Sequence, residues 1–302
     1  MHEASAASPV NGFFRRAADF LQMTGDDRFR FLSGQVTCDV AKLQPGDGVY
    51  GFFTTAKGRI ESDVTVTADA ERLRLHLPPG RGPVILERLR KYIIVDRVEV
   101  ETAELVAFAY VGPDADVARS ELPEGTVALE RQDGGFDVWL SPDDVASTAS
   151  AWRDAGLREL DAETWERHRI ESGRPRWGVD FGLDNFPKET GLEDAVSYTK
   201  GCYLGQEVVA RIHYRGGVQR RLRGLRLSAE PSAATGADVV FNGKVVGKLG
   251  SAVAGPSGAL GLAILHDNAA PGSTVELVDG GPDAGRNVGQ GTVVELPFER
   301  PV

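Results

Sequence analysis

The chain has 302 residues, of which 41% are hydrophobic and 26% are charged, and its formal net charge is −10. This composition is typical of a globular protein with a buried core, and the length predicts two or three packed units. The acidic balance argues against nucleic-acid binding over the whole surface, and no stretch approaches the roughly 20 apolar residues that span a bilayer.

The first third alternates between helix and strand signals. Asp26 and Asp27 predict the start of a helix that ends near residues 43–46. Aromatic and β-branched residues around a turn at 56–58 predict a β-hairpin. The predicted elements are hairpin strands at Val49–Thr54 and Ile60–Thr67, a strand at Leu73–Leu77, a helix at Pro83–Tyr92 and a strand at Val95–Tyr110.

The middle third is predicted to hold three more helices. Two begin at Ser141 and Asp161, and the second is stopped by residues 173–175. Apolar residues then recur at helical spacing from Gly201 to His213, and Gly216-Gly217 is the expected C-terminal stop.

Short β-rich runs separated by turns fill the chain after Gly217. Asn242-Gly243 between two apolar runs is a strong hairpin signal. Several short strands of this kind predict a small barrel or sandwich. The runs are Gln219–Leu227, Asp238–Phe241, Lys244–Val253, Ala259–Leu265, Thr274–Val278 and Gly291–Leu296.

Several kinds of site are excluded by the absence of their motifs. The chain has no Gly-x-x-x-x-Gly-Lys-Ser/Thr loop, no Gly-x-Gly-x-x-Gly turn after a strand and no Gly-x-Ser-x-Gly elbow. Its five histidines show no chelating spacing with each other or with the two cysteines. We therefore expect no structural zinc site and no self-contained four-cysteine cluster.

The sequence also carries information on the cellular compartment of the protein. Residues 1–11 lack the basic start and apolar run of a signal peptide. Two cysteines and no glycosylation sequon fit a reducing compartment, so we expect a cytoplasmic protein.

Cys202 is the strongest candidate for chemistry. With Thr199 as N-cap, Cys202 would lie in the first turn of a helix, where the helix dipole and Lys200 both favour a thiolate. The alternative is a buried cysteine packed as a small apolar residue. For Cys38, beside Asp39, nothing in the sequence favours the thiolate, and we expect no role for it.

A basic segment stands out from the acidic background. No Asp or Glu occurs between Val208 and Ala229, while arginines alternate with apolar residues from Arg221 to Leu227. This alternation predicts a strand with arginines on one side. Such a patch suits an anion such as a polyglutamate tail or an RNA backbone, and the alternative is a solvated edge.

The octapeptide Lys200–Glu207, KGCYLGQE, resembles the K-G-C-Y-x-G-Q-E signature of the YgfZ-type folate-binding proteins, relatives of the glycine-cleavage aminomethyltransferases. Weaker matches at 31–37 and 243–248 extend the resemblance over nearly the whole chain. It implies an α+β fold, a multi-domain ring of ferredoxin-like α/β parts around a central cavity, with a C-terminal antiparallel β-barrel. The implied domains are residues 1–215, in two parts near 1–110 and 111–215, and a barrel at 216–302.

The resemblance also implies a tetrahydrofolate site. Asp133 matches a family glutamate that binds the pterin, because a carboxylate can accept both hydrogens of a 2-aminopterin edge; the alternative is a plain turn at 133–135. Arg169 matches the family's Arg-x-Glu-x-Gly helix end and would meet a folate carboxylate or form an ordinary helix-surface pair. The further expected cofactor-binding residues, from the motif and the helix that follows, are Tyr203, Gln206, Glu207 and Arg211.

Gly58–Asp63, GRIESD, resembles the Gly-Gly-Ile-x-Asp-Asp stretch of the aminomethyltransferases, whose carboxylate assists one-carbon transfer. Ser62 replaces the first aspartate and only Asp63 remains. Serine cannot serve as a carboxylate base, so aminomethyl transfer is not expected. The alternative for Asp63 is an outward polar residue on a strand.

Two classes of function follow. The first is a folate-binding accessory protein that helps assemble or repair iron–sulfur enzymes, including one that modifies tRNA, with Cys202, Lys200 and Asp63 at its centre and iron–sulfur proteins or their assembly factors as partners. The second is a tetrahydrofolate-dependent aminomethyl- or methyltransferase. Ser62 and the cysteine motif favour the first class. The expectation is therefore a protein without enzymatic activity rather than an enzyme. RNA binding through the arginine strand is a third, minor reading.

Overall fold

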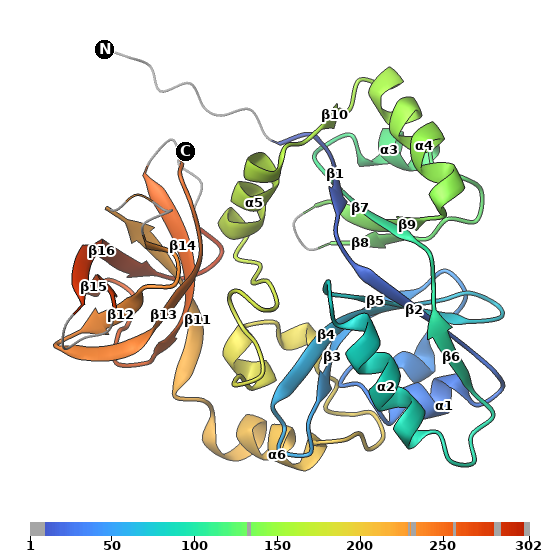
Figure 1. Cartoon of the computed structure of the whole chain (residues 1–302), viewed down its shortest axis with the longest axis horizontal. Coiled ribbons are helices and arrows are strands. Elements are labelled where there is room, and N and C mark those ends of the chain that lie inside the picture. Colours follow the sequence, from blue (N-terminus) through green and yellow to red (C-terminus); the bar gives the residue numbers. More distant parts are fainter. Residues whose placement is uncertain are drawn as a thin grey trace. The chain divides into compact units, whose positions relative to one another are not determined.

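The computed structural model describes residues 10–131, 134–228, 230, 234–255, 258–280 and 285–298. It forms two compact units (Figure 1). Unit 1 comprises Met1–Asp161 and Asp194–Gln206, and unit 2 comprises Ala162–Glu193 and Glu207–Val302. The chain therefore leaves unit 1, builds part of unit 2 and returns. The predicted boundaries near 110 and 215 stay predictions.

Unit 1 contains an antiparallel sheet with one apolar face covered by helices. Its strand order is β3(Gly48–Thr54)-β4(Ile60–Ala68)-β5(Leu73–Leu77)-β2(Asp19–Thr24)-β6(Glu99–Thr102). The helices α1(Arg28–Ser33) and α2(Gly82–Tyr92) contribute Leu32 and Leu89 to a core that alternate strand residues such as Leu21 and Leu75 complete. Because side chains alternate between faces, the polar residues of these strands lie on the opposite face.

The second sheet of unit 1 is also covered by helices on one face, and it is antiparallel except for one parallel pair at its edge. Its order is β10(Arg158–Glu159)-β1(Gly12–Arg16)-β7(Val106–Val111)-β9(Phe136–Leu140)-β8(Ala128–Glu130), with α3(Ala115–Ser120) and α4(Pro142–Asp154) over one face (Figure 1). Trp152 of α4 packs on Phe13 at 4.8 Å between ring centroids and donates to the Ala118 carbonyl. The helices thus cover the apolar face of this sheet. Side chains of its opposite face contact the first sheet, as Trp139 does with Phe20.

Unit 2 is a closed antiparallel barrel with one helix against it. The barrel order is β11(Arg220–Leu227)-β14(Ala259–His266)-β13(Lys244–Val253)-β12(Asp238–Phe241)-β15(Thr274–Asp279)-β16(Arg286–Val294). Asn242 and Gly243, with φ of 50° and 72°, make the predicted tight turn between β12 and β13. The helix α5(Ala162–Glu171) packs on β13 and β14.

The remaining elements are short. They are the 3₁₀ turns η1(Val40–Lys42), η2(Pro187–Thr190) and η3(Glu193–Ala195), the helix α6(Gln206–Arg211) and the π-helical turn η4(Ile212–Gly216). No helix in the described part of the chain is long and apolar enough to cross a membrane.

The predicted α+β class with a C-terminal antiparallel barrel is confirmed. The single strand predicted over Val95–Tyr110 is wrong, because residues 103–105 separate β6 from β7 and the two strands enter different sheets. The helix predicted from Gly201 is also wrong, since α6 begins at Gln206.

Candidate functional site

The motif Lys200–Glu207 forms an ordered loop that precedes α6. Gly205 has φ of +87°, a left-handed conformation that an α-helix cannot include. Residues 201–203 therefore stay outside the helix, and Cys202 lies four residues before its first turn. The predicted helix-terminus setting of Cys202 is thus wrong. The side chain itself is exposed, and Cys202 is a free thiol.

Lys200 is held by backbone oxygens at the end of α1. Its Nζ donates to the carbonyls of Ser33 at 2.6 Å and Val36 at 2.7 Å, and it lies 5.0 Å from the centroid of the Tyr203 ring. Burial lowers the pKa of Lys200 to about 8, against the opposing influence of Cys38 and Asp39. The contacts of this ammonium are thus with α1, and support of Cys202 by Lys200 stays a prediction.

Further hydrogen bonds fasten the same loop to unit 1. Leu204 donates its N–H to the Gly34 carbonyl at 3.2 Å and accepts from Thr54 Oγ1 at 2.5 Å. A Cβ on Gly205 would lie 2.3 Å from the Thr55 carbonyl oxygen, so only glycine permits this approach. Gln206 Oε1 accepts from the Tyr203 N–H at 3.3 Å and closes the turn. These hydrogen bonds fix the backbone of the loop on both sides of the exposed Cys202.

Cys38 has a different environment. It is buried in the core of the first sheet, and burial raises the pKa of its thiol to about 12, although the charge of Lys200 opposes this. Cys38 therefore stays protonated at neutral pH, in agreement with the expectation that it has no thiolate role.

Asp63 lies on the polar face of β4, opposite to Ser62. Ser62 is fully buried and its hydroxyl donates to the Asp63 carbonyl at 2.9 Å. Asp63 Oδ2 accepts from the Tyr50 hydroxyl at 2.9 Å, while its Oδ1 is buried without a hydrogen-bond partner among the described residues. Burial raises the pKa of Asp63 to about 6, and the Tyr50 hydrogen bond and the Arg16 charge only partly oppose this.

The second sheet supplies an ion pair whose arginine, Arg16, is close enough to influence the pKa of Asp63. Asp137 Oδ1 accepts from Arg16 at 2.9 Å and from Arg131 at 3.2 Å. Burial disfavours the carboxylate, but Arg16 and Arg131 outweigh it and lower the pKa of Asp137 to about 2. Asp137 is therefore ionised throughout the neutral and mildly acidic range, whereas Asp63 takes up a proton as the pH falls through about 6.

An aromatic group completes this inter-sheet cluster. His76 stacks on Trp139 at 5.5 Å with 8° between ring planes, and Phe20 meets both rings edge-on. Burial, followed by the charge of Arg16, lowers the pKa of His76 to about 3, so the imidazole is neutral. Its Nε2 is buried without a partner in the described structure. We name Arg16, Tyr50, Asp63, His76, Asp137 and Trp139 the inter-sheet cluster.

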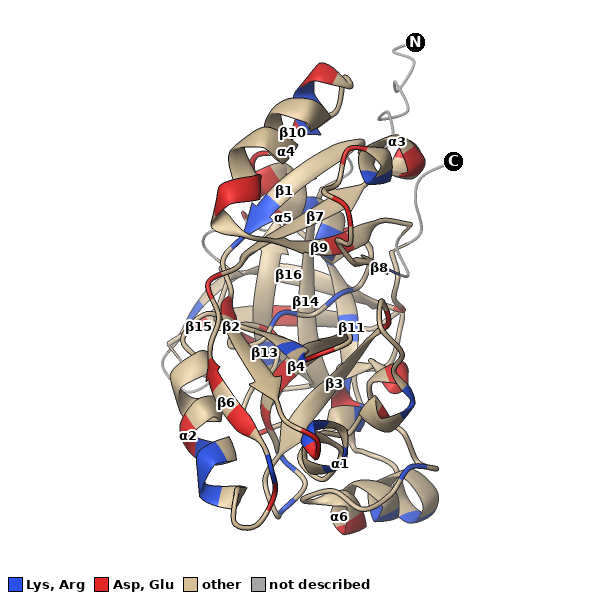
Figure 2. Ribbon diagram, turned by 90° about the vertical axis from the view of Figure 1, so that its right-hand side faces the viewer, with Lys and Arg blue, Asp and Glu red and all other residues tan. Residues whose placement is uncertain are grey.

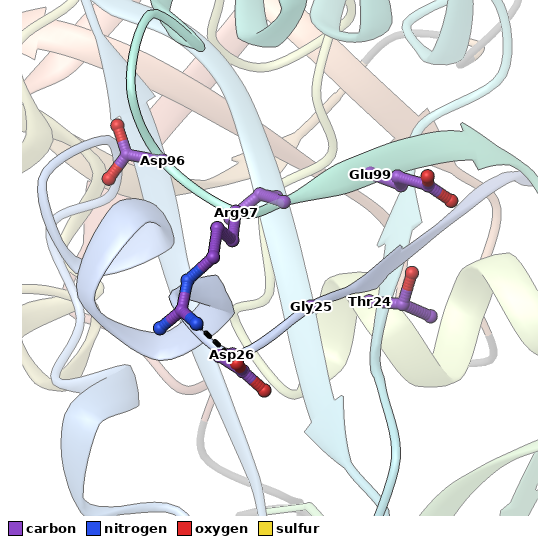
Figure 3. Close-up of a pocket in the computed structure, with 7 residues that line it drawn as sticks. Thr24, Gly25, Asp26, Asp96, Arg97 and Glu99 are labelled. Atoms are coloured by element: carbon purple, nitrogen blue, oxygen red, sulfur yellow. Dashed lines mark ion pairs between the residues drawn. The ribbon is translucent and has the colours of Figure 1, made fainter.

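Two hollows lie near these sheets in unit 1. A cavity of about 430 Å³ is lined by Arg16, Phe20 and Pro79, among others, and so adjoins the inter-sheet cluster. A larger hollow of about 510 Å³ lies where β2 ends and β6 begins (Figure 3). There Arg97 pairs with Asp26 at 2.9 Å, and none of the predicted site residues lines it.

The structure brings the Cys202 loop and Asp63 to the same edge strand. Phe52 of β3 pairs with Asp63, and Thr54, which holds Leu204, is two residues further along. At a rise of roughly 3.4 Å per residue, this anchor lies about 7 Å along the strand from the position opposite Asp63. Both predicted reactive groups therefore belong to one region of unit 1.

Arg169 lies in unit 2 and is buried. Its guanidinium donates to Glu166 at 3.0 Å, to Asp180 at 3.0 Å, to Ser251 and to the Arg174 carbonyl. This network joins α5 to β13, and the folate contact of Arg169 stays a prediction.

The other predicted residues are distributed as follows. Asp133 lies outside the described residues. Tyr203 is buried with a hydroxyl that has no described partner, while Glu207 and Arg211 are exposed on α6. Within the described ranges, no group of three or more His, Cys, Asp or Glu is arranged to hold a metal ion.

Sequence reasoning missed most of the inter-sheet cluster. Its members come from β1, β3, β4, β5 and β9, so no spacing along the chain connects them. One sequence feature could have indicated His76. In the alternating strand Leu73–Leu77, it occupies a position that faces away from the core formed by the leucines.

Comparison with known proteins supports the fold and relates the chain to proteins of known family. No family model matches the chain. The chain is 31% identical over 306 residues to a chloroplast protein of Arabidopsis thaliana named as a candidate transferase, which covers 92% of this chain and 68% of that protein. It is 31% identical over 225 residues to the tRNA-modifying protein YgfZ of Vibrio vulnificus strain YJ016, covering 70% and 69% of the two chains.

A second YgfZ protein, from Vibrio atlanticus, is 28% identical over 211 residues, which cover 67% of this chain and 65% of that protein. The chain thus spans about two thirds of the length of these curated relatives. Among solved structures, the glycine cleavage system aminomethyltransferase T of Bartonella henselae matches with a TM-score of 0.81 at 22% identity, covering 97% and 88% of the two chains. The fold is that of an aminomethyltransferase.

Proposed function

Because the chain belongs to the YgfZ-type family of aminomethyltransferase-related proteins, we propose that it is a folate-binding accessory protein that supports the assembly or repair of iron–sulfur enzymes. Enzymes that modify tRNA are the proposed beneficiaries, since the bacterial relatives are named tRNA-modifying proteins. Iron–sulfur proteins or their assembly factors are the proposed partners, and the cytoplasm is the proposed compartment.

The observation that carries the proposal is the environment of Asp63. Among the residues that the structure describes, no donor reaches its buried Oδ1, and no partner reaches Nε2 of the neutral His76 imidazole. Buried polar atoms of this kind are costly unless a ligand or water pairs with them. A reduced pterin, which carries several N–H donors, is suited to such a site.

The residues present therefore fit a folate. In this proposal Asp63 accepts from an N–H of the ligand, the Arg16–Asp137 pair adds a fixed dipole, and Trp139 supplies an apolar wall. Asp133 stays the proposed pterin ligand. Tetrahydrofolate, when bound, supplies nitrogens that accept a one-carbon unit.

Cys202 is the proposed reactive group of the accessory role. It is exposed, while the residues around it are fixed by hydrogen bonds from Lys200 and Leu204 to the end of α1. A thiol presented in this way can contact a partner protein or a cluster without rearrangement of unit 1.

Titration calorimetry with tetrahydrofolate tests the folate site. Asp63→Asn replaces one carboxylate oxygen by an amide group and should weaken binding by about 1–3 kcal/mol. Asp154→Asn removes a charge from the exposed end of α4 and should leave binding unchanged. Equal affinity of the Asp63→Asn and wild-type proteins would remove Asp63 from the site.

A tetrahydrofolate-dependent aminomethyl- or methyltransferase is the second candidate, and the pKa of Asp63 favours it. A carboxyl group with a pKa of about 6 exchanges protons readily near neutral pH, as a general acid or base must. Against it, Ser62 faces the core and offers no second carboxylate. Folate-dependent ammonia release from an aminomethyl-lipoyl carrier would establish the transferase.

A further inference from the structure

The arginines in the segment between Val208 and Ala229, which contains no Asp or Glu, differ in whether they form ion pairs. Three of the four arginines of β11 are paired with acidic neighbours, and the fourth, Arg226, lies over the Phe298 ring. The ion pairs are Arg220–Glu189 at 3.2 Å, Arg221–Asp267 at 3.0 Å and Arg223–Glu295 at 2.8 Å. These ion pairs favour the alternative that the arginine strand is a solvated edge, and anion binding along it stays a prediction.

The other arginines of this segment lie just before β11. Arg211 ends α6 and Arg215 lies in η4, four residues later, and both are exposed. Among the residues that the structure describes, neither guanidinium has an acidic partner within ion-pair distance. Lys188 adds a third cation, because its Nζ lies 3.5 Å from the His213 carbonyl oxygen. Figure 2 shows basic positions along the helical segment labelled α6.

An aromatic ring stands among these cations. Tyr214 is 68% exposed, and His213 meets its ring edge-to-face at 4.8 Å, with 85° between the planes. The π-helical turn that carries both rings is a rare conformation, and such turns occur often at functional sites. A large exposed aromatic face beside cations offers a stacking surface together with phosphate contacts.

We propose that Arg211, Tyr214, Arg215 and Lys188, the basic turn of unit 2, bind unpaired RNA. Arginine and lysine contact phosphates, and a base stacks on the tyrosine. An acidic protein surface would use the cations but would gain nothing specific from the exposed ring. The proposal does not depend on folate binding or on Cys202.

Fluorescence anisotropy of the full chain with a labelled single-stranded RNA of about 12 nucleotides tests the proposal. Arg211→Gln combined with Arg215→Gln should weaken binding about ten-fold and lower the slope of log affinity against log salt by about 1.4. Arg221→Gln combined with Arg223→Gln removes the same charge from β11 and should change the affinity less than about two-fold.

The ring is tested separately. Tyr214→Leu should weaken binding at least about five-fold, whereas Tyr214→Phe, which keeps the stacking face, should bind as the wild type does. Lys188→Met provides an independent loss of one cation should the double variant fail to fold, and it should lower the salt slope by about 0.7.

Three results would overturn the proposal. They are equal losses for the two arginine pairs, competition by polyglutamate as strong as that by RNA of equal charge, and wild-type binding too weak to measure at physiological salt. Loss of tetrahydrofolate binding together with RNA binding in the variant that combines Arg211→Gln with Arg215→Gln would count against the RNA site and favour the cofactor role predicted for Arg211.

Discussion

Asp63→Asn should make the protein more stable at neutral pH, and this can be worked out from the inter-sheet cluster. The pKa of Asp63 rises from 3.8 to about 6 because the carboxyl group is buried, and the hydrogen bond from Tyr50 only partly offsets the cost of burying its charge. Since the folded state holds the proton more tightly than the unfolded state, the stability that this proton contributes is present below pH 4 and is lost as the pH rises through about 6.

The magnitude follows from the size of the shift. One pKa unit corresponds to about 1.4 kcal/mol, so a shift from 3.8 to about 6 corresponds to roughly 3 kcal/mol over the full range. Between pH 4.5 and 7.5 the unfolding free energy should fall by about 2 kcal/mol through this group alone. Asparagine cannot ionise, and the variant should lack this loss.

Urea unfolding of both proteins at pH 4.5 and 7.5 measures the difference. The free energy gained by Asp63→Asn relative to wild type should be about 2 kcal/mol greater at pH 7.5 than at pH 4.5. Asp154→Asn, at the exposed end of α4, is the matched control and should show no such dependence. A difference that is absent, or that has the opposite sign, would refute the assignment of Asp63 as a buried carboxyl group with a raised pKa.

Three further predictions concern other parts of unit 1. Asp137→Asn should destabilise the protein at pH 7 by about 2 kcal/mol or more, because the pKa lowered to about 2 marks a stabilising carboxylate; the loss should shrink as the pH falls toward 2, and a constant difference in urea unfolding would contradict this. Gly205→Ala should cost more than about 2 kcal/mol, because its Cβ would approach the Thr55 carbonyl, whereas Gly191→Ala, also at positive φ but with open space, should cost about 1 kcal/mol; equal thermal shifts would argue against the close approach. Cys202→Ser should leave the melting temperature unchanged and abolish support of iron–sulfur enzyme activity in a deletion strain, and full complementation would exclude a functional thiol.

Elements with a clear local pattern could be predicted from the sequence. The β3–β4 hairpin, β5 and α2 were found from alternation and helical spacing, and the β12–β13 turn from Asn242-Gly243. The helix start at Gly201 was wrong because apolar spacing carries no information on backbone handedness, and Gly205 at positive φ interrupts the pattern.

The same distinction between local and non-local information applies to the residues of the candidate site. Asp63 was found through its resemblance to a family motif, which is local in sequence. Arg16, His76 and Asp137 could not be connected to it, because three-dimensional sheet pairing rather than spacing brings β1, β5 and β9 together. The ion pairs of β11 could not be predicted for a similar reason: the acidic partners of its arginines lie 31 to 72 positions away along the chain.

The return of residues 194–206 to unit 1 has a consequence for biosynthesis. Thr37 donates to the carbonyl of Ala195, 158 positions later, and Lys200 reaches Ser33 across 167 positions. A nascent chain that has released only residues 1–161 therefore lacks the donors for the end of α1, and non-local closures of this length fold slowly. Folding of unit 1 during synthesis is therefore complete only after residues 194–206 have left the ribosome. The segment that completes unit 1 is also the one that carries the exposed Cys202 thiol.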